Sequence, residues 1–147
     1  MSTTWAKGVL LDTSVWVRYF RPQRYKKLKT EVEKVLAAGS VFTCWVVKAE
    51  LLVGAKDEAA LERLLAEFQA LEDVALTPAV WEGAARLGHT LRRQGFLIPL
   101  PDLLIAQAAI SAGLELWHAD EHFEQIQRIT PLKTRSFLQI EENDNRS

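Results

Sequence analysis

Five short apolar runs alternate with longer segments of helical periodicity, and this alternation constrains the fold more than any other feature of the chain. The runs lie at residues 8–11, 40–44, 74–77, 114–117 and 129–132. Runs of this length, bounded by turn residues, are typical of buried strands. Strands that alternate with helices assemble into a parallel sheet. The sequence therefore predicts an α/β fold with a mostly parallel central β-sheet flanked by α-helices on both faces.

The predicted helices follow these runs and end at helix-breaking residues. They lie at residues 15–20, 26–38, 45–55, 57–71, 78–94, 103–112 and 121–127. Pro22, Gly39 and Gly113 interrupt or close three of them, as proline and glycine do. Pro99 and Pro101 predict a loop over residues 97–101, so that Asp102 begins the next helix.

Length and composition indicate one soluble domain. The chain has 147 residues, of which 48% are hydrophobic and 25% charged, as in an ordinary globular protein. We expect a domain over residues 1–140 and a polar, mobile tail over residues 141–147. No apolar run is long enough to span a bilayer and no signal peptide is evident, so we expect a cytoplasmic protein with no membrane contact. The single cysteine, Cys44, rules out an internal disulfide and fits a reducing compartment.

Basic residues gather in the first third of the chain, although the formal net charge is −1. A nucleic-acid-binding protein often has a positive excess, so the total counts mildly against such a role. The distribution favours it, because one stretch concentrates the positive charge, and there it can hold RNA phosphates. The alternative is a solvated helix face. The candidate RNA-binding residues are Arg18, Arg21, Arg24, Lys26 and Lys27.

Four carboxylates stand where predicted strands end or within predicted helices: Asp12, Glu50, Asp102 and Asp120. In a parallel sheet the crevice lies at the carboxyl ends of the strands, so all four can face one side. Gathered there, they would repel one another unless a hard cation such as Mg2+ or Mn2+ lay between them. Such an ion exposed to solvent suggests phosphodiester chemistry. Each acid also has a plainer alternative, since Asp12, Asp102 and Asp120 can cap helices and Glu50 can be a solvated helix residue.

Four segments together resemble the PIN-domain nucleases and, within them, the VapC toxins of bacterial toxin–antitoxin pairs. They are residues 10–16 (LLDTSVW), 48–54 (KAELLVG), 101–106 (PDLLIA) and 118–123 (HADEHF). The resemblance covers nearly the whole chain. It implies a Mg2+- or Mn2+-dependent endoribonuclease, inhibited by a cognate antitoxin and forming a homodimer.

By the same resemblance, Asp12, Glu50, Asp102 and Asp120 are the catalytic, metal-binding acids, and Ser14 is a hydroxyl that orients the site. One departure concerns the position two residues before the last acid, where the family often has Thr or Ser and this chain has His118. A histidine there can hydrogen-bond a phosphate or a water molecule. His118 and His122 also suggest a zinc site. Two histidines four residues apart share a metal only when both lie on one face of a helix, however, and His118 ends a predicted strand.

Two other functions require residues that this sequence lacks. A phosphatase of the haloacid-dehalogenase type needs a second aspartate two residues after the first, where this chain has Ser14. A phosphoacceptor receiver domain needs an acidic pair near the first strand and a late lysine, and neither is evident. A housekeeping RNA-processing nuclease, or a non-catalytic module that binds RNA or protein, remains the alternative to a toxin.

Overall fold

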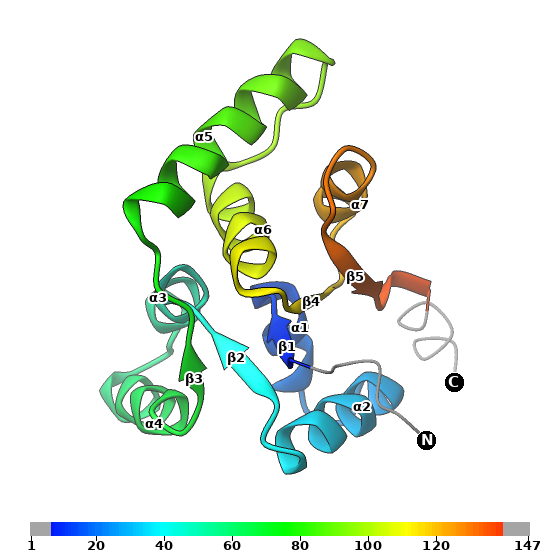
Figure 1. Cartoon of the computed structure of the whole chain (residues 1–147). Coiled ribbons are helices and arrows are strands. Elements are labelled where there is room, and N and C mark those ends of the chain that lie inside the picture. Colours follow the sequence, from blue (N-terminus) through cyan, green and yellow to red (C-terminus); the bar gives the residue numbers. More distant parts are fainter. Residues whose placement is uncertain (1–6, 140–147) are drawn as a thin grey trace.

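The structure is a computed structural model that describes residues 7–139. Its centre is a sheet of five parallel strands in the order β3-β2-β1-β4-β5 (Figure 1). The strands are β1 (Val9–Leu11), β2 (Val41–Thr43), β3 (Glu72–Asp73), β4 (Glu115–His118) and β5 (Lys133–Ser136). The predicted polar tail, residues 141–147, lies outside the described residues.

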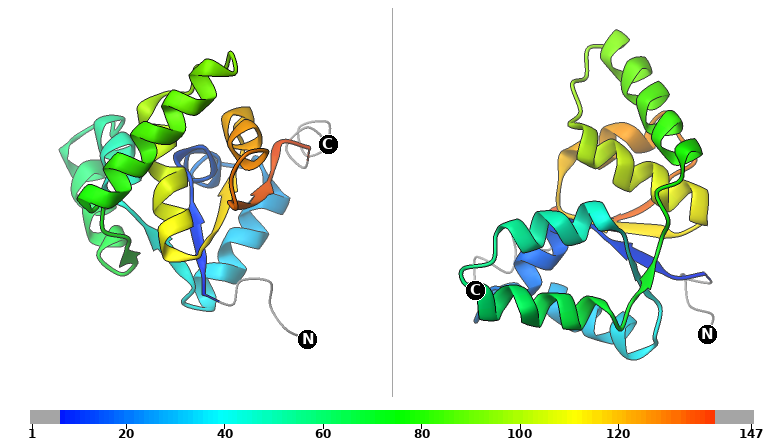
Figure 2. Two further views of the ribbon diagram at one scale, coloured as in Figure 1. Left: turned by 45° about the horizontal axis from the view of Figure 1, so that its top comes forward. Right: turned by 90° about the vertical axis from the view of Figure 1, so that its left-hand side faces the viewer.

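Seven helices in the described part of the chain cover the sheet. They are α1 (Thr13–Tyr19), α2 (Lys26–Ala37), α3 (Trp45–Val53), α4 (Glu58–Phe68), α5 (Pro78–Arg93), α6 (Leu100–Ala112) and α7 (Glu121–Gln127). The view along the edge of the sheet places α2 and α4 on one side of the strands and α5 and α6 on the other (Figure 2). Helices on both faces of a parallel sheet confirm the predicted α/β class. Within residues 7–139, none of the helices has the length and apolar character needed to cross a membrane.

Two strand predictions were wrong in position. The third strand is Glu72–Asp73 rather than residues 74–77, and the fifth is Lys133–Ser136 rather than residues 129–132. Both are edge strands with polar residues, which pair on one side only and do not need a buried apolar run. The apolar residues that suggested strands pack against the core just outside them. Val74 and Leu76 are partly buried there, and Leu132 is 3% exposed.

Helix α6 begins at Leu100, two residues before the predicted start, and includes Pro101 in its first turn. Proline is tolerated there because the first helical N–H groups have no partner within the helix. The helix packs closely on α5, since Gly88 has no side chain. A Cβ atom at that position would lie 2.6 Å from Cδ1 of Leu103. This close packing fixes the first turn of α6, which carries Asp102.

The strand order sets the position of the candidate site. The central strand β1 has β2 on one side and β4 on the other. The chain adds β2 and β3 on one side of β1 and then returns to add β4 and β5 on the other side. Asp12 directly follows β1, and its N–H donates to the carbonyl oxygen of Trp117 in β4 at 2.9 Å. Crevices at such switch points are the usual ligand sites of parallel sheets. Asp12 and Asp120 therefore follow the two strands that define the crevice.

Candidate active site

Asp12 is a buried carboxylate, 3% exposed, at the end of β1. Its Oδ2 atom accepts two hydrogen bonds from Ser14, from the backbone N–H at 3.0 Å and from the hydroxyl at 2.5 Å. The Ser14 hydroxyl oxygen in turn accepts the N–H of Ala119, beyond the end of β4, at 2.9 Å. Ser14 therefore joins the ends of the two central strands and holds Asp12 between them, as an orienting hydroxyl must.

Burial raises the pKa of Asp12 to about 6. The two hydrogen bonds from Ser14 lower this pKa, and the negative charges of Asp102 and Asp120 raise it further. Desolvation and neighbouring like charges both disfavour the ionised carboxylate, and a cation placed among the acids would remove both penalties. The position of Asp12 therefore has the electrostatic character of a metal site.

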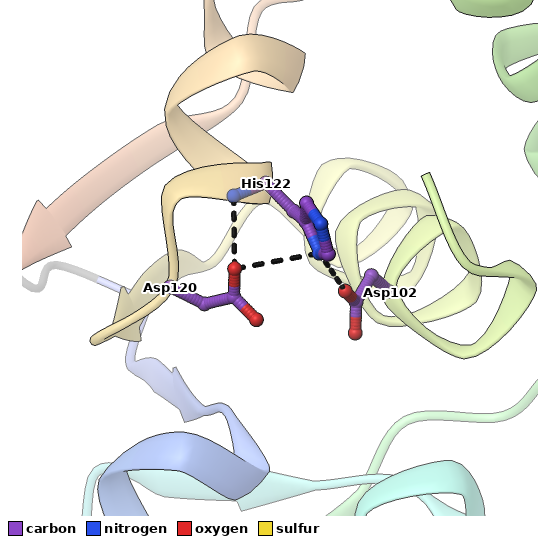
Figure 3. A group of neighbouring side chains, drawn as sticks. All are labelled: Asp102, Asp120 and His122. Atoms are coloured by element: carbon purple, nitrogen blue, oxygen red, sulfur yellow. Dashed lines mark hydrogen bonds and ion pairs between the residues drawn. The ribbon is translucent and has the colours of Figure 1, made fainter. Parts of the chain in front are cut away.

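Asp102, Asp120 and His122 form a compact group of oxygen and nitrogen donors (Figure 3). One donor atom from each lies within 4.8 Å of the other two. His122 Nδ1 donates to Oδ2 of Asp102 at 2.7 Å and lies 3.4 Å from Oδ1 of Asp120. These side chains come from the first turn of α6 and from the start of α7, so two helix starts bring the three donors together.

The capping alternative is correct for two of the acids and does not remove them from the site. Asp12 caps α1 through Oδ2, and Asp120 caps α7 through Oδ1, which accepts the N–H of His122 at 2.9 Å. Each cap uses one lone pair of one carboxylate oxygen, so both carboxylates keep lone pairs that can bind a cation. Asp102 lies in the first turn of α6 and is not its N-cap residue.

Burial raises the pKa of Asp102, and the hydrogen bond from His122 lowers it. The charges of Asp120 and Glu50 raise it again. Glu50 lies on α3 with an exposed side chain, and its Oε1 accepts a hydrogen bond from the Thr13 hydroxyl at 2.6 Å. Adjacent residues of α1 thus bind two of the acids, Thr13 binding Glu50 and Ser14 binding Asp12. Mutual electrostatic influence links all four predicted acids around the ends of β1 and β4.

His118, whose ring can hydrogen-bond a phosphate or a water molecule, lies in the core of the structure. Its side chain has no exposed surface, and its ring packs 5.2 Å from that of Phe123. Nδ1 accepts the backbone N–H of Asp120 at 3.2 Å, and burial lowers the pKa of the ring, which favours the neutral form that this bond requires. His118 therefore holds the backbone of Asp120 through this hydrogen bond.

His122 is the residue that sequence reasoning missed. The sequence suggests a role for His122 only as a zinc partner of His118, and the structure separates the two rings, one in the core and the other beside Asp102. The signal in the sequence was its place two residues after Asp120. In the first turn of a helix capped by that acid, the side chain returns toward the crevice.

The predicted RNA-binding residues surround the turn between α1 and α2. Arg18 Nη1 donates to the carbonyl oxygen of Ser14 at 2.9 Å, so this guanidinium is bonded to the residue that holds Asp12. The Arg24 guanidinium lies 4.9 Å from the centre of the Tyr25 ring. Lys26 and Lys27 line a surface hollow of about 310 Å³ together with Arg135. Arg21, Arg24, Lys26 and Lys27 are exposed, and their role with RNA stays a prediction.

Comparison with known protein families agrees with this geometry. The sequence model of the PIN-domain family matches residues 9–129, which run from β1 to just beyond α7. The chain belongs to the PIN-domain family.

Similar members of this PIN-domain family are ribonucleases. The chain is 34% identical over 139 residues to Ribonuclease VapC11 of Mycobacterium tuberculosis, covering 88% of this chain and 98% of that protein. It is 34% identical over 124 residues to Ribonuclease VapC51 of the same species, covering 82% and 86%. A crystal structure of VapBC2 from Rickettsia felis, bound to a promoter DNA fragment, superposes with a TM-score of 0.71 at 22% identity, covering 87% of this chain and 97% of that one. That likeness confirms the fold.

The donor set of this PIN domain fits a hard divalent cation. Three carboxylates and one imidazole border the crevice, and the buried one, Asp12, has a pKa raised by its surroundings. Both hydrogen bonds from Ser14 go to Oδ2 of Asp12. Carboxylate oxygens at such density are the ligands that Mg2+ and Mn2+ prefer.

Proposed function

We propose that this chain is a VapC-type toxin, a Mg2+- or Mn2+-dependent endoribonuclease that hydrolyses RNA phosphodiester bonds. The observation that carries this proposal is the convergence of Asp12, Asp102 and Asp120 at the switch point of the sheet, with Glu50 beside them. The relatives at 34% identity are named as VapC ribonucleases, which supports the same chemistry for this chain.

Each acid has a distinct part in the proposed site. Asp12 supplies a fixed carboxylate, because Ser14 holds one of its oxygens and both strand ends hold its backbone. Asp102 and Asp120 supply carboxylates that are more open to solvent and can adjust around a ligand. Glu50, exposed on α3, is placed to orient water rather than to contact a deeply held ion. A bound divalent cation supplies neutralisation of the phosphate charge and activation of the attacking water.

The basic residues of the α1–α2 turn would hold the RNA backbone. Arg21, Arg24, Lys26 and Lys27 are exposed, and phosphate contacts require accessible positive charge. Arg18 lies within reach of the site through its bond to Ser14. Such contacts give affinity with little sequence preference, so the choice of RNA target lies elsewhere on the surface.

A cognate antitoxin is the proposed protein partner. A toxin–antitoxin complex from Klebsiella pneumoniae is among the structures with a similar fold. This chain has large apolar side chains at its surface that such a partner, or a second copy in a homodimer, could cover. Val53 is 87% exposed, Trp45 56% and Trp81 47%. Exposed apolar groups of this size often mark interaction surfaces. Light scattering on the purified chain measures whether it is a dimer.

RNA cleavage by the purified protein tests the proposed activity. We expect cutting of tRNA or rRNA with Mg2+ or Mn2+ and none with EDTA. The variant Asp120→Asn should lose it, since asparagine keeps the cap on α7 but removes the charge. Asp57→Asn is the matched control, because Asp57 caps α4 through Oδ1 and takes no part in the acid cluster.

Two outcomes would redirect the assignment. The metal-site assignment would be contradicted by RNA cleavage that continues in EDTA. It would also be contradicted if Asp120→Asn cleaved RNA at the wild-type rate. No cutting of any RNA by folded, antitoxin-free protein would favour the non-catalytic binding module. Cleavage confined to maturation sites of precursor RNAs would favour a housekeeping nuclease.

A further inference from the structure

His122 is placed like a ligand of the proposed cation, and this inference rests on the proposed metal-dependent function. Its Nδ1 atom lies 2.7 Å from Oδ2 of Asp102 and 3.4 Å from Oδ1 of Asp120 (Figure 3). Around an octahedral ion with ligands at about 2.1 Å, neighbouring ligand atoms lie about 3 Å apart and opposite ones about 4.2 Å apart. The separations within this group match neighbouring positions on one ion.

The local structure keeps the imidazole in this position. His122 lies in the first turn of α7, and its own N–H donates to Oδ1 of Asp120 at 2.9 Å. The backbone that carries the ring is therefore fixed to one of the acids that the ring approaches. Its side chain is 36% exposed, so the imidazole can carry its proton on Nε2 and exchange the hydrogen bond from Nδ1 to Asp102 for a metal bond without crossing a packed core.

We propose that His122 Nδ1 binds the same cation as Asp102 and Asp120 and gives the site a preference for Mn2+ over Mg2+. The physical reason is ligand type. Mg2+ takes oxygen ligands and keeps much of its water, whereas imidazole nitrogen binds transition-metal ions more strongly. A site of carboxylates alone discriminates weakly between the two ions, and one nitrogen changes the balance.

A simpler role for His122 is that of a hydrogen-bond donor that only orients Asp102. The variant His122→Asn separates the two roles, because the asparagine amide nitrogen reaches nearly the same place as Nδ1 and can donate to Asp102. It supplies no imidazole ligand. His89→Asn is the control, since His89 is exposed on α5 and lies outside the acid group.

Pulsed electron paramagnetic resonance on the Mn2+-loaded protein, in a nitrogen-free buffer, tests the ligand directly. We expect nitrogen hyperfine coupling typical of a bound imidazole in the wild type and in His89→Asn, and its loss in His122→Asn. Calorimetry should show that His122→Asn raises the Kd for Mn2+ by about tenfold or more, with a much smaller change for Mg2+.

The possible failures of this inference and of the proposed function differ. Mn2+ bound without nitrogen coupling, or with coupling and ion preference unchanged in His122→Asn, would overturn the role of His122 and leave the metal-dependent nuclease standing. If the wild type does not bind Mn2+, or binds it with an affinity that Asp102→Asn leaves unchanged, the metal site itself would be overturned. Both proposals would then fail.

Discussion

The two halves of the acid site differ in how firmly the fold holds them. On one side Asp12 is 3% exposed and fixed by Ser14 between two strand ends. On the other, the side chains of Asp102, Asp120 and His122 are 15%, 35% and 36% exposed and bond mainly to one another. The buried half fixes the position of a ligand, and its cost is the desolvation of the Asp12 carboxylate. The open half can adjust around that ligand, so the same chemical change should have different consequences in the two halves.

The largest expected effect is the loss of cleavage in Asp12→Asn. We expect the rate to fall by roughly 10²–10³-fold, because the variant removes a fixed charge at the reacting centre without changing the size of the side chain. Initial rates with Mg2+ and Mn2+ measure this, with Asp57→Asn as the control. An activity close to that of the wild type would show that the buried half is structural only.

The same variant should also change how stability depends on pH. The pKa of Asp12 is raised in the folded state to about 6 from an ordinary value of 3.8. The folded protein therefore holds this proton more tightly than the unfolded chain. The resulting stabilisation is fully present below about pH 4 and is lost as the pH rises through about 6. A shift of this size corresponds to roughly 3 kcal/mol at most.

Urea unfolding in EDTA at pH 4 and pH 7 measures this effect. The wild type should lose up to a few kcal/mol of unfolding free energy relative to Asp12→Asn between the two values. At pH 7 the variant should be the more stable of the two, although it is inactive. If the unfolding free energies of the wild type and of Asp12→Asn changed equally with pH, burial would not raise the pKa of Asp12. The two halves of the site would then not differ in electrostatics.

Ser14→Ala should produce an intermediate effect in both activity and stability. The change leaves the N–H of Ala119 without its partner and removes one hydrogen bond from Asp12. A buried group left unpaired costs about 1–3 kcal/mol. Loss of a residue that orients a metal ligand typically costs about 10–100-fold in metal affinity or activity. Thermal unfolding and Mn2+ titration measure the two quantities.

Ser111→Ala provides the comparison for Ser14→Ala, since the Ser111 hydroxyl only donates to a carbonyl oxygen of its own helix. A stability loss in Ser14→Ala with unchanged metal affinity would indicate that Ser14 joins the strands but does not orient Asp12.

The sequence predicted the local features of the molecule better than those that depend on packing between distant segments. Apolar strands and their terminal acids are local features, so the parallel sheet, Asp12 and Asp120 could be placed before the structure. The edge strands could not, because β3 and β5 are built from polar residues such as Glu72, Asp73 and Lys133 and carry no apolar signal.

The two histidines near Asp120 show the same limit at the level of side chains. His118 and His122 are both polar residues beside an acid in the sequence. Only the packing of α7 on the sheet sends the first ring into the core against Phe123 and leaves the second beside Asp102. The direction of a side chain at a helix start depends on the neighbouring helix, here α6, whose Asp102 lies 20 residues before His122. Periodicity cannot supply that information.

The smallest expected effect is that of Glu50→Gln, in the most exposed part of the site. The carboxamide oxygen can still accept the bond from the Thr13 hydroxyl, so only the charge is lost. We expect the unfolding free energy to stay within about 0.5 kcal/mol of the wild type. Cleavage should fall by about tenfold, less than for Asp12→Asn, if Glu50 acts through water. Glu62→Gln, an exposed acid on α4, is the matched control. A loss equal to that of Asp12→Asn would place Glu50 among the direct ligands, and the open half would then be as indispensable as the buried one.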